Sequence, residues 1–254
     1  MKNNLAQGRE YEEQERFQEA LAEYGKAIEA DPESLEAVLR RGGLLAELGQ
    51  YSSAIKDYTA ALAINPYEGI VYNSRGDTFA SMGRHEEAIA DFTEALSLNP
   101  DDVDSFYNRG LSLAELGKMD AALADLNSAL KIDPQHGGAY NNRGLIYVRT
   151  GDFVRAVADF SQAIEVRTGF ACSYDHRGLA YEKLGDQSQA IADYTSALAI
   201  APRNLDSLYH RASAYAAIGE TEHAIADFQL LLQVADVKHP FSTLARQRLS
   251  ELGR

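Results

Sequence analysis

Five of the six prolines in this chain fall on one 34-residue grid, and this spacing restricts the fold more than any other feature. Thr168 occupies the one empty slot of the grid. The five prolines are Pro32, Pro66, Pro100, Pro134 and Pro202. A fixed period of this length indicates tandem copies of one structural unit, each of which buries its apolar face against its neighbours.

If each of these prolines is counted as position 32, the sequence predicts seven repeats and leaves residues 239–254 as a C-terminal segment. The predicted repeats are 1–34, 35–68, 69–102, 103–136, 137–170, 171–204 and 205–238. Apolar residues recur with a 3.6-residue period on two separate stretches of each repeat, which predicts two helices per repeat. The chain is therefore expected to be all-α.

Small residues form columns in the same register. Position 8 is glycine in every repeat but the last, where it is Ala212, and position 20 is alanine in all seven. Glycine at position 8 facing alanine at position 20 is expected to let two antiparallel helices approach closely. Glycine at position 15 suits the left-handed end of the first helix, and proline at position 32 follows the second.

These columns, with large and mostly aromatic residues at positions 11 and 24, make residues 1–238 resemble the tetratricopeptide repeat family. The Asn-Arg-Gly triplets at 108–110 and 142–144 resemble those of bacterial members. The resemblance implies a right-handed α-solenoid in which the first helix of each repeat lines a concave groove. It also implies a non-catalytic scaffold for protein–protein interaction.

The C-terminal segment is expected to form a capping helix. It begins near Pro240, a residue suited to a first helical turn, and its apolar residues fall on one stripe. These residues are Phe241, Leu244, Ala245, Leu249 and Leu252. Solenoid ends need such a cover, so residues 239–254 are predicted to pack on the last repeat.

Arginine recurs at position 7 and an acidic residue at position 23. We expect each arginine to pair with the acid of the preceding repeat, so that Arg41 pairs with Glu23 and Arg143 pairs with Asp125. A partly buried, bidentate arginine–carboxylate contact would hold neighbouring repeats in place. This column is therefore interpreted as structural.

Positions 5 and 6 of the first helix carry amides, imidazoles and phenols, which suit recognition of a peptide backbone because asparagine both donates and accepts hydrogen bonds. The alternative is a polar face that needs no ligand. Acids outnumber bases on this face, so an extended peptide or helix of basic or neutral character is the expected ligand. The candidate residues are Asn73, Tyr107, Asn108, Asn141, Asn142, Leu145, His176, Tyr209 and His210.

Other function classes find little support. His176 and His210 lie one repeat apart, too far to share a zinc ion, and Cys172 is expected to be a surface thiol although His176 follows it by one turn. We predict no catalytic residue, cofactor or metal. The net charge of −14 argues against nucleic acid, and no stretch approaches the ~20 apolar residues of a membrane span.

The single cysteine and the polar N-terminus favour a cytoplasmic protein. A monomeric adaptor is expected. The alternative is a structural or self-associating solenoid module of a larger protein or assembly, which would associate end to end.

Overall fold

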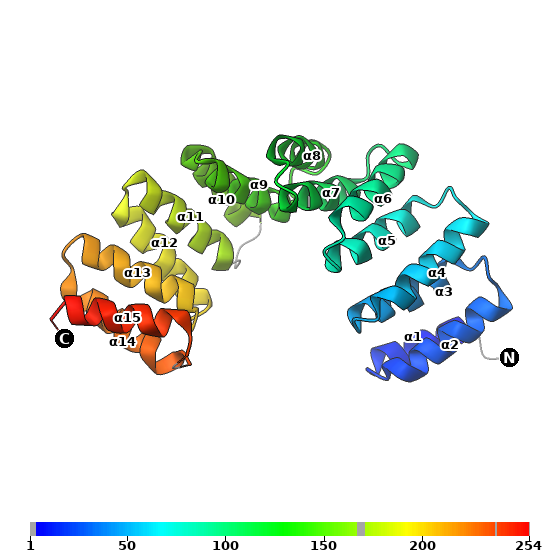
Figure 1. Ribbon diagram of the computed structural model, residues 1–254, viewed down its shortest axis with the longest axis horizontal. Helices are drawn as coiled ribbons and strands as arrows, with labels where there is room; N and C mark the ends of the chain where they lie inside the picture. Colours follow the sequence, from blue (N-terminus) through cyan, green and yellow to red (C-terminus); the bar gives the residue numbers. More distant parts are fainter. Residues whose placement is uncertain (1–3, 167–170, 237, 254) are drawn as a thin grey trace. The chain divides into compact units, whose positions relative to one another are not determined.

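The computed structural model describes residues 4–166, 171–236 and 238–253, and in these ranges all regular structure is helical (Figure 1). The turn that carries Thr168 lies outside them. The helices are α1 (Asn4–Glu13), α2 (Phe17–Ala30), α3 (Leu35–Glu47), α4 (Tyr51–Ile64), α5 (Gly69–Ser81), α6 (His85–Leu98), α7 (Val103–Glu115), α8 (Met119–Ile132), α9 (Gly137–Thr150), α10 (Phe153–Val166), α11 (Ala171–Leu184), α12 (Gln187–Ile200), α13 (Leu205–Ala217), α14 (Thr221–Val234) and α15 (Pro240–Glu251).

The helices belong to two compact units, residues 1–133 with α1 to α8 and residues 134–254 with α9 to α15. Within each unit, consecutive helices pack as hairpins such as α5–α6 and α11–α12, and each hairpin packs on the next. Every hairpin repeats the previous one 34 residues later. Each unit is thus a stack of helix pairs, as the periodicity predicts.

Close approach within a hairpin depends on the glycine at position 8. A Cβ atom on Gly42 would lie 2.5 Å from Tyr58 Cε1, and one on Gly144 would lie 2.7 Å from Phe160 Cε1. The group that excludes a side chain here is therefore the large residue at position 24, and not the alanine at position 20 that the sequence suggested. The rings of Tyr58 and Phe160 are buried as a result.

The turn between the two helices of a hairpin uses a left-handed residue at position 15, as predicted. Glycines at this position have φ between 72° and 83°. Repeat 1 has Glu15 there, and this residue also takes a positive φ, of 57°. The turn geometry is therefore the same with or without the glycine, although glycine adopts it without a steric penalty.

The arginines at position 7 pair with a different acid from the one expected. Arg109 donates from Nε and Nη2 to both carboxylate oxygens of Asp125, at 2.7 and 2.8 Å, and Asp125 belongs to the same repeat. The other five pairs are Arg41–Asp57, Arg75–Asp91, Arg143–Asp159, Arg177–Asp193 and Arg211–Asp227. The prediction of pairs with the preceding repeat was wrong, because the crossing that sets position 8 against position 24 also sets position 7 against position 23.

Four of these arginines, Arg75, Arg109, Arg177 and Arg211, also link neighbouring repeats through their third nitrogen. Arg109 Nη1 donates to Thr93 Oγ1 of the preceding repeat at 3.1 Å, and Arg177 Nη1 donates to Ser161 Oγ at 3.0 Å. In four repeats, the guanidinium also lies over an aromatic ring at position 4, with 5.5 to 5.7 Å between its central carbon and the ring centroid. One side chain thus fixes both the hairpin and its contact with the previous hairpin.

Helix α15 packs on α13 and α14 and keeps the register of a first helix. Its residues Ala245 and Leu249 join the core cluster that contains Phe228 and Leu231. Gly253 follows it with φ 82°, 34 residues after Gly219. The position-8 glycine is replaced by Arg246, which is exposed.

Candidate protein-binding surface

The first helices of successive repeats lie next to one another in each unit. Helix α5 contacts both α3 and α7 in the first unit, and α11 contacts α9 and α13 in the second. No second helices of neighbouring repeats contact each other as extensively in the part of the chain that the structure describes. The first helices therefore form the inner surface of each stack, which agrees with the expected position of the groove.

In the first unit this surface is hollowed into an open cavity of about 590 Å³. Its walls come mainly from α3, α5 and α7, with two tyrosines from α4. The lining residues are Gly43, Ala46, Glu47, Tyr51, Tyr58, Asn73, Ser74, Asp77, Thr78, Ser81, Asp104 and Asn108. Two of the predicted binding residues, Asn73 and Asn108, thus lie in one cavity.

The two asparagines differ in what they already bind. Asn73 Nδ2 donates to Ser105 Oγ of the next repeat at 2.6 Å. The half-buried Asn108 makes no hydrogen bond through its amide within the described residues. Asn108 can therefore offer both a donor and an acceptor to a ligand, whereas the Asn73 amide already uses a donor in its hydrogen bond with Ser105.

In the second unit, the position-5 side chains also connect repeats. Asn141 Oδ1 accepts from Ser173 Oγ at 3.2 Å, and Asp175 accepts from Ser207 Oγ at 2.7 Å. Asn141 is only 7% exposed. The sequence reasoning missed this role, although serine at position 3 of the next repeat is its visible signal.

The histidines at position 6 lie against aromatic rings. His176 Nδ1 is 3.1 Å from Asn141 Oδ1, and its ring centroid is 5.5 Å from that of Phe160. The ring of His210 stacks on Tyr194 at 5.7 Å, and its Nδ1 is 3.5 Å from Glu182 Oε2. Both imidazoles are thus half-buried parts of the surface.

These surroundings shift the pKa values of the two histidines in opposite directions. Burial lowers the pKa of His176 below its ordinary value of 6.5, against the pull of Asp175 and Asp206. Burial opposes protonation of His210 as well, but the hydrogen bond with Glu182 and nearby carboxylates outweigh it and raise that pKa. As the pH falls, His210 is therefore expected to take up a proton before His176 does.

We expect an NMR titration of the imidazole protons to show His210 titrating at a higher pH than His176. The raised pKa of His210 means that its contribution to stability is complete below pH 6.5 and is lost as the pH rises through the folded-state value. Glu182→Gln should lower the pKa of His210 and leave that of His176 in place. Equal midpoints in the wild type would contradict the assignment.

The remaining candidates make contacts of other kinds. The Tyr209 ring stacks on Phe241 of α15, with centroids 4.8 Å apart, so it contacts the terminal helix. Leu145 packs against the cluster of Ala156, Phe160 and Ala180. Asn142 donates to the carbonyl of Gly138 at 3.0 Å, and Tyr107 is half-buried on α7.

Neither metal nor nucleophile chemistry gains support from the geometry. Among the described residues, no three histidine, cysteine or acidic side chains gather as a metal site would require. Burial raises the pKa of the Cys172 thiol, which disfavours the reactive thiolate.

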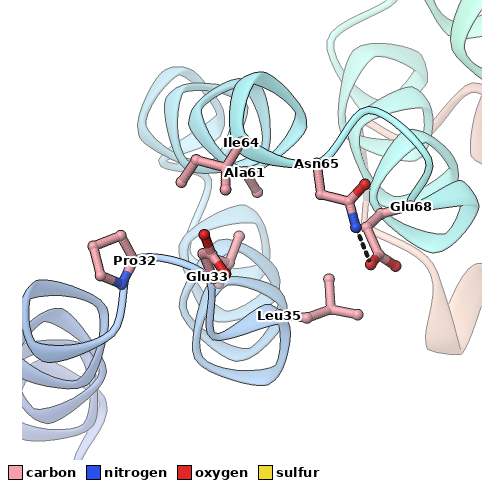
Figure 2. Close-up of a pocket in the computed structure, with 8 residues that line it drawn as sticks. Pro32, Glu33, Leu35, Ala61, Ile64, Asn65 and Glu68 are labelled. Atoms are coloured by element: carbon pink, nitrogen blue, oxygen red, sulfur yellow. Dashed lines mark hydrogen bonds between the residues drawn. The ribbon is translucent and has the colours of Figure 1, made fainter.

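A smaller cavity lies at the turns that join repeats 1 to 3 (Figure 2). Pro32, Glu33 and Leu35 line one side, and Ile64, Asn65 and Glu68 line the other. Asn65 Nδ2 donates to Glu68 Oε1 at 2.7 Å, as Figure 2 shows. An equivalent cavity one repeat later is lined by Tyr67, Ile70 and Leu98, so this feature comes from the repeat itself.

Sequence comparison assigns the repeats to a family. A model described as tetratricopeptide repeat matches residues 5–68 and 73–137, and two further models of that description match residues 171–204 and residues 137–168 and 205–236. The chain belongs to the tetratricopeptide repeat family. A search of curated proteins found no match to this sequence.

Solved structures of other tetratricopeptide repeat (TPR) proteins share the fold. A TPR protein from Parabacteroides merdae is 19% identical, with 96% of each chain covered and a TM-score of 0.70. PilW, a type IV pilus biogenesis factor, is 22% identical over 80% of this chain and 94% of its own, with a TM-score of 0.71. YrrB, described as having an unusual peptide-binding site, is 23% identical over 73% of this chain and 95% of its own, with a TM-score of 0.59.

No helix in the described part of this TPR chain is long and apolar enough to cross a membrane.

Proposed function

We propose that this TPR protein is a non-catalytic cytoplasmic scaffold that binds an extended segment or a helix of a partner protein along its first helices. The observation that carries this proposal is the cavity on α3, α5 and α7, where the Asn108 amide faces open space. An amide in such a place can pair with both the N–H and the C=O of a peptide backbone. The similarity to YrrB, whose structure is described as that of a peptide-binding TPR protein, agrees with this use of the fold.

Acidic residues give the surface a preference among partners. Glu47, Asp77 and Asp104 line the cavity without a basic residue beside them. A basic or neutral partner segment is therefore favoured, and binding of a basic one should weaken as salt is added.

The double variant Asn108→Ala with Asn142→Ala should weaken peptide binding without changing the helical content. Peptides selected from a displayed library on the wild-type chain would supply the ligand, and titration calorimetry would measure affinity. The loss should be about tenfold, because one or two hydrogen bonds are removed.

The control is Glu94→Ala, which alters an exposed side chain on the second helix α6. It should leave affinity unchanged. Selected peptides that crosslink to second helices, and bind the double variant normally, would show that the binding surface lies elsewhere.

A structural, self-associating module is the second candidate. Tyr67 and Ile70 are 78% and 56% exposed at a repeat edge, and apolar exposure of this kind suits contact with another chain. Light scattering separates the two functions. An adaptor stays monomeric as concentration rises, whereas a self-associating module gains mass.

A further inference from the structure

The cavity on α3, α5 and α7 holds negative charge that nothing in it neutralises. Three of its lining residues are Glu47, Asp77 and Asp104, and none is lysine, arginine or histidine. None of these three carboxylates forms an ion pair in the described part of the chain. The neighbouring guanidinium of Arg75 is held by Asp91. Asp77 is reached by solvent, yet the surrounding protein removes enough water to raise the pKa of its carboxyl group.

Tyr58 adds an observation that does not depend on these acids. In repeats 1 and 6 the equivalent hydroxyls donate to a glutamate at position 12, Tyr24 to Glu12 and Tyr194 to Glu182. Position 12 of repeat 2 is Ala46, which lines the cavity together with Tyr58. Tyr58 is 2% exposed, and its hydroxyl has no hydrogen-bond partner among the described residues.

The Tyr58 hydroxyl stays protonated at neutral pH, since burial, Asp57 and Asp77 raise its pKa to about 12. A neutral phenol keeps one proton to donate and lone pairs to accept. The Tyr58 residue lines the cavity and its hydroxyl is open to solvent there, so a ligand atom can replace water as its hydrogen-bond partner. The cavity therefore presents acceptors at its rim and an unpaired hydroxyl in its wall.

We propose that this cavity is the subsite for a lysine or arginine side chain of the bound segment. The proposal rests on the function proposed above and names the chemistry of one ligand residue. The ammonium or guanidinium N–H groups would donate to Asp77, Asp104 and the Tyr58 oxygen, while Asn108 pairs with the ligand backbone. An ion pair with Asp77, whose carboxyl group is partly shielded from water, is stronger than one on an open surface.

Three synthetic peptides test the subsite on the 254-residue chain. They are acetyl-Gly-Ala-Lys-Ala-Gly-amide and the same peptide with norleucine or glutamate at the centre. Each is titrated up to millimolar concentration into the ¹⁵N-labelled protein, and the amide signals of the protein are followed by NMR. The lysine peptide should shift the amides near Glu47, Asp77 and Asn108. It should bind about three- to tenfold more tightly than the norleucine peptide, and the glutamate peptide should bind more weakly than both.

Variants assign the preference to named groups. Asp77→Asn should reduce the lysine-to-norleucine ratio toward one, and Tyr58→Phe should reduce it in part while the fold is retained. Glu94→Gln, an exposed change on α6, should leave the ratio unchanged. A circular dichroism melt of each variant shows whether a lost preference reflects lost structure.

The outcomes separate this proposal from the broader one. Equal affinity of the lysine and norleucine peptides at the same amides would overturn the subsite while supporting a peptide-binding surface. Absence of any shift would also overturn the subsite, and the selected-peptide experiment would decide the function independently. Shifts confined to α4 and α6 would contradict both.

Discussion

Replacing Arg109 with alanine should lower the free energy of unfolding by roughly 2–4 kcal/mol, between the effects typical of exposed and buried ion pairs. The Arg109 and Asp125 side chains are 20% and 9% exposed. Removing the guanidinium leaves the Asp125 carboxylate with both of its charge-assisted hydrogen bonds broken. It also removes the bond to Thr93, so the contact with the preceding repeat weakens at the same time.

A double-mutant cycle in urea denaturation measures which acid is the partner. Arg109→Ala combined with Asp125→Ala should be much less destabilising than the sum of the single changes, because the double variant leaves no charged side chain of this pair without its partner. Arg109→Ala combined with Asp91→Ala is the matched control, since Asp91 is held by Arg75. Its effects should add to within about 0.5 kcal/mol. A larger coupling with Asp91 than with Asp125 would refute the intra-repeat pairing.

Gly42→Ala should destabilise the protein by about 1–3 kcal/mol even though alanine is the better helix former. The new methyl group would lie 2.5 to 2.8 Å from Cε1, Cζ and the hydroxyl oxygen of Tyr58. The buried Tyr58 ring would have to move against Val38 and Leu62, which belong to the same core cluster. Overpacking of this kind opposes the gain in helix propensity.

The adjacent residue supplies the control for this prediction. A Cβ atom on Gly43 would meet nothing within 4 Å, so Gly43→Ala should stabilise the same helix by about 0.5–1 kcal/mol. Opposite shifts of the urea midpoint are thus expected from two neighbouring and chemically identical changes. Shifts of the same sign would show that the helix pair does not depend on close approach at position 8.

The fold could be predicted because its main determinants repeat. Proline at 32, glycine at 15 and small residues at 8 and 20 recur in register, and each has a local physical reason that does not depend on distant contacts. The helix pairs, the left-handed turn and the apolar stripe of residues 239–254 follow from such local rules. Where one repeat departs from the pattern, the other repeats still indicate its conformation. Glu15, for example, takes the left-handed conformation of the glycines at the same position.

Partner assignments were harder to predict because they depend on how helices cross. A helical wheel places Arg143 on a face of its helix but does not say whether Asp125 or Asp159 comes within reach. Similarly, Asn141 is polar and lies on the correct face, yet its amide oxygen accepts from Ser173. The unpaired hydroxyl of Tyr58 was missed for a different reason: Ala46 stands at position 12, where repeats 1 and 6 have the glutamate that accepts from the equivalent tyrosine.

The replacement at Arg246 has a consequence for any attempt to lengthen this protein. Helix α15 keeps the register of a first helix, but its position-8 residue is an arginine where the other first helices except α13 have glycine. A second helix appended after it would meet the arginine stem at a point where, in five of the hairpins, even a Cβ atom added to the glycine would come within 2.4 to 2.8 Å of ring atoms. Pairing α15 with an added second helix would therefore require a small residue in place of Arg246, either glycine or the alanine found at position 212.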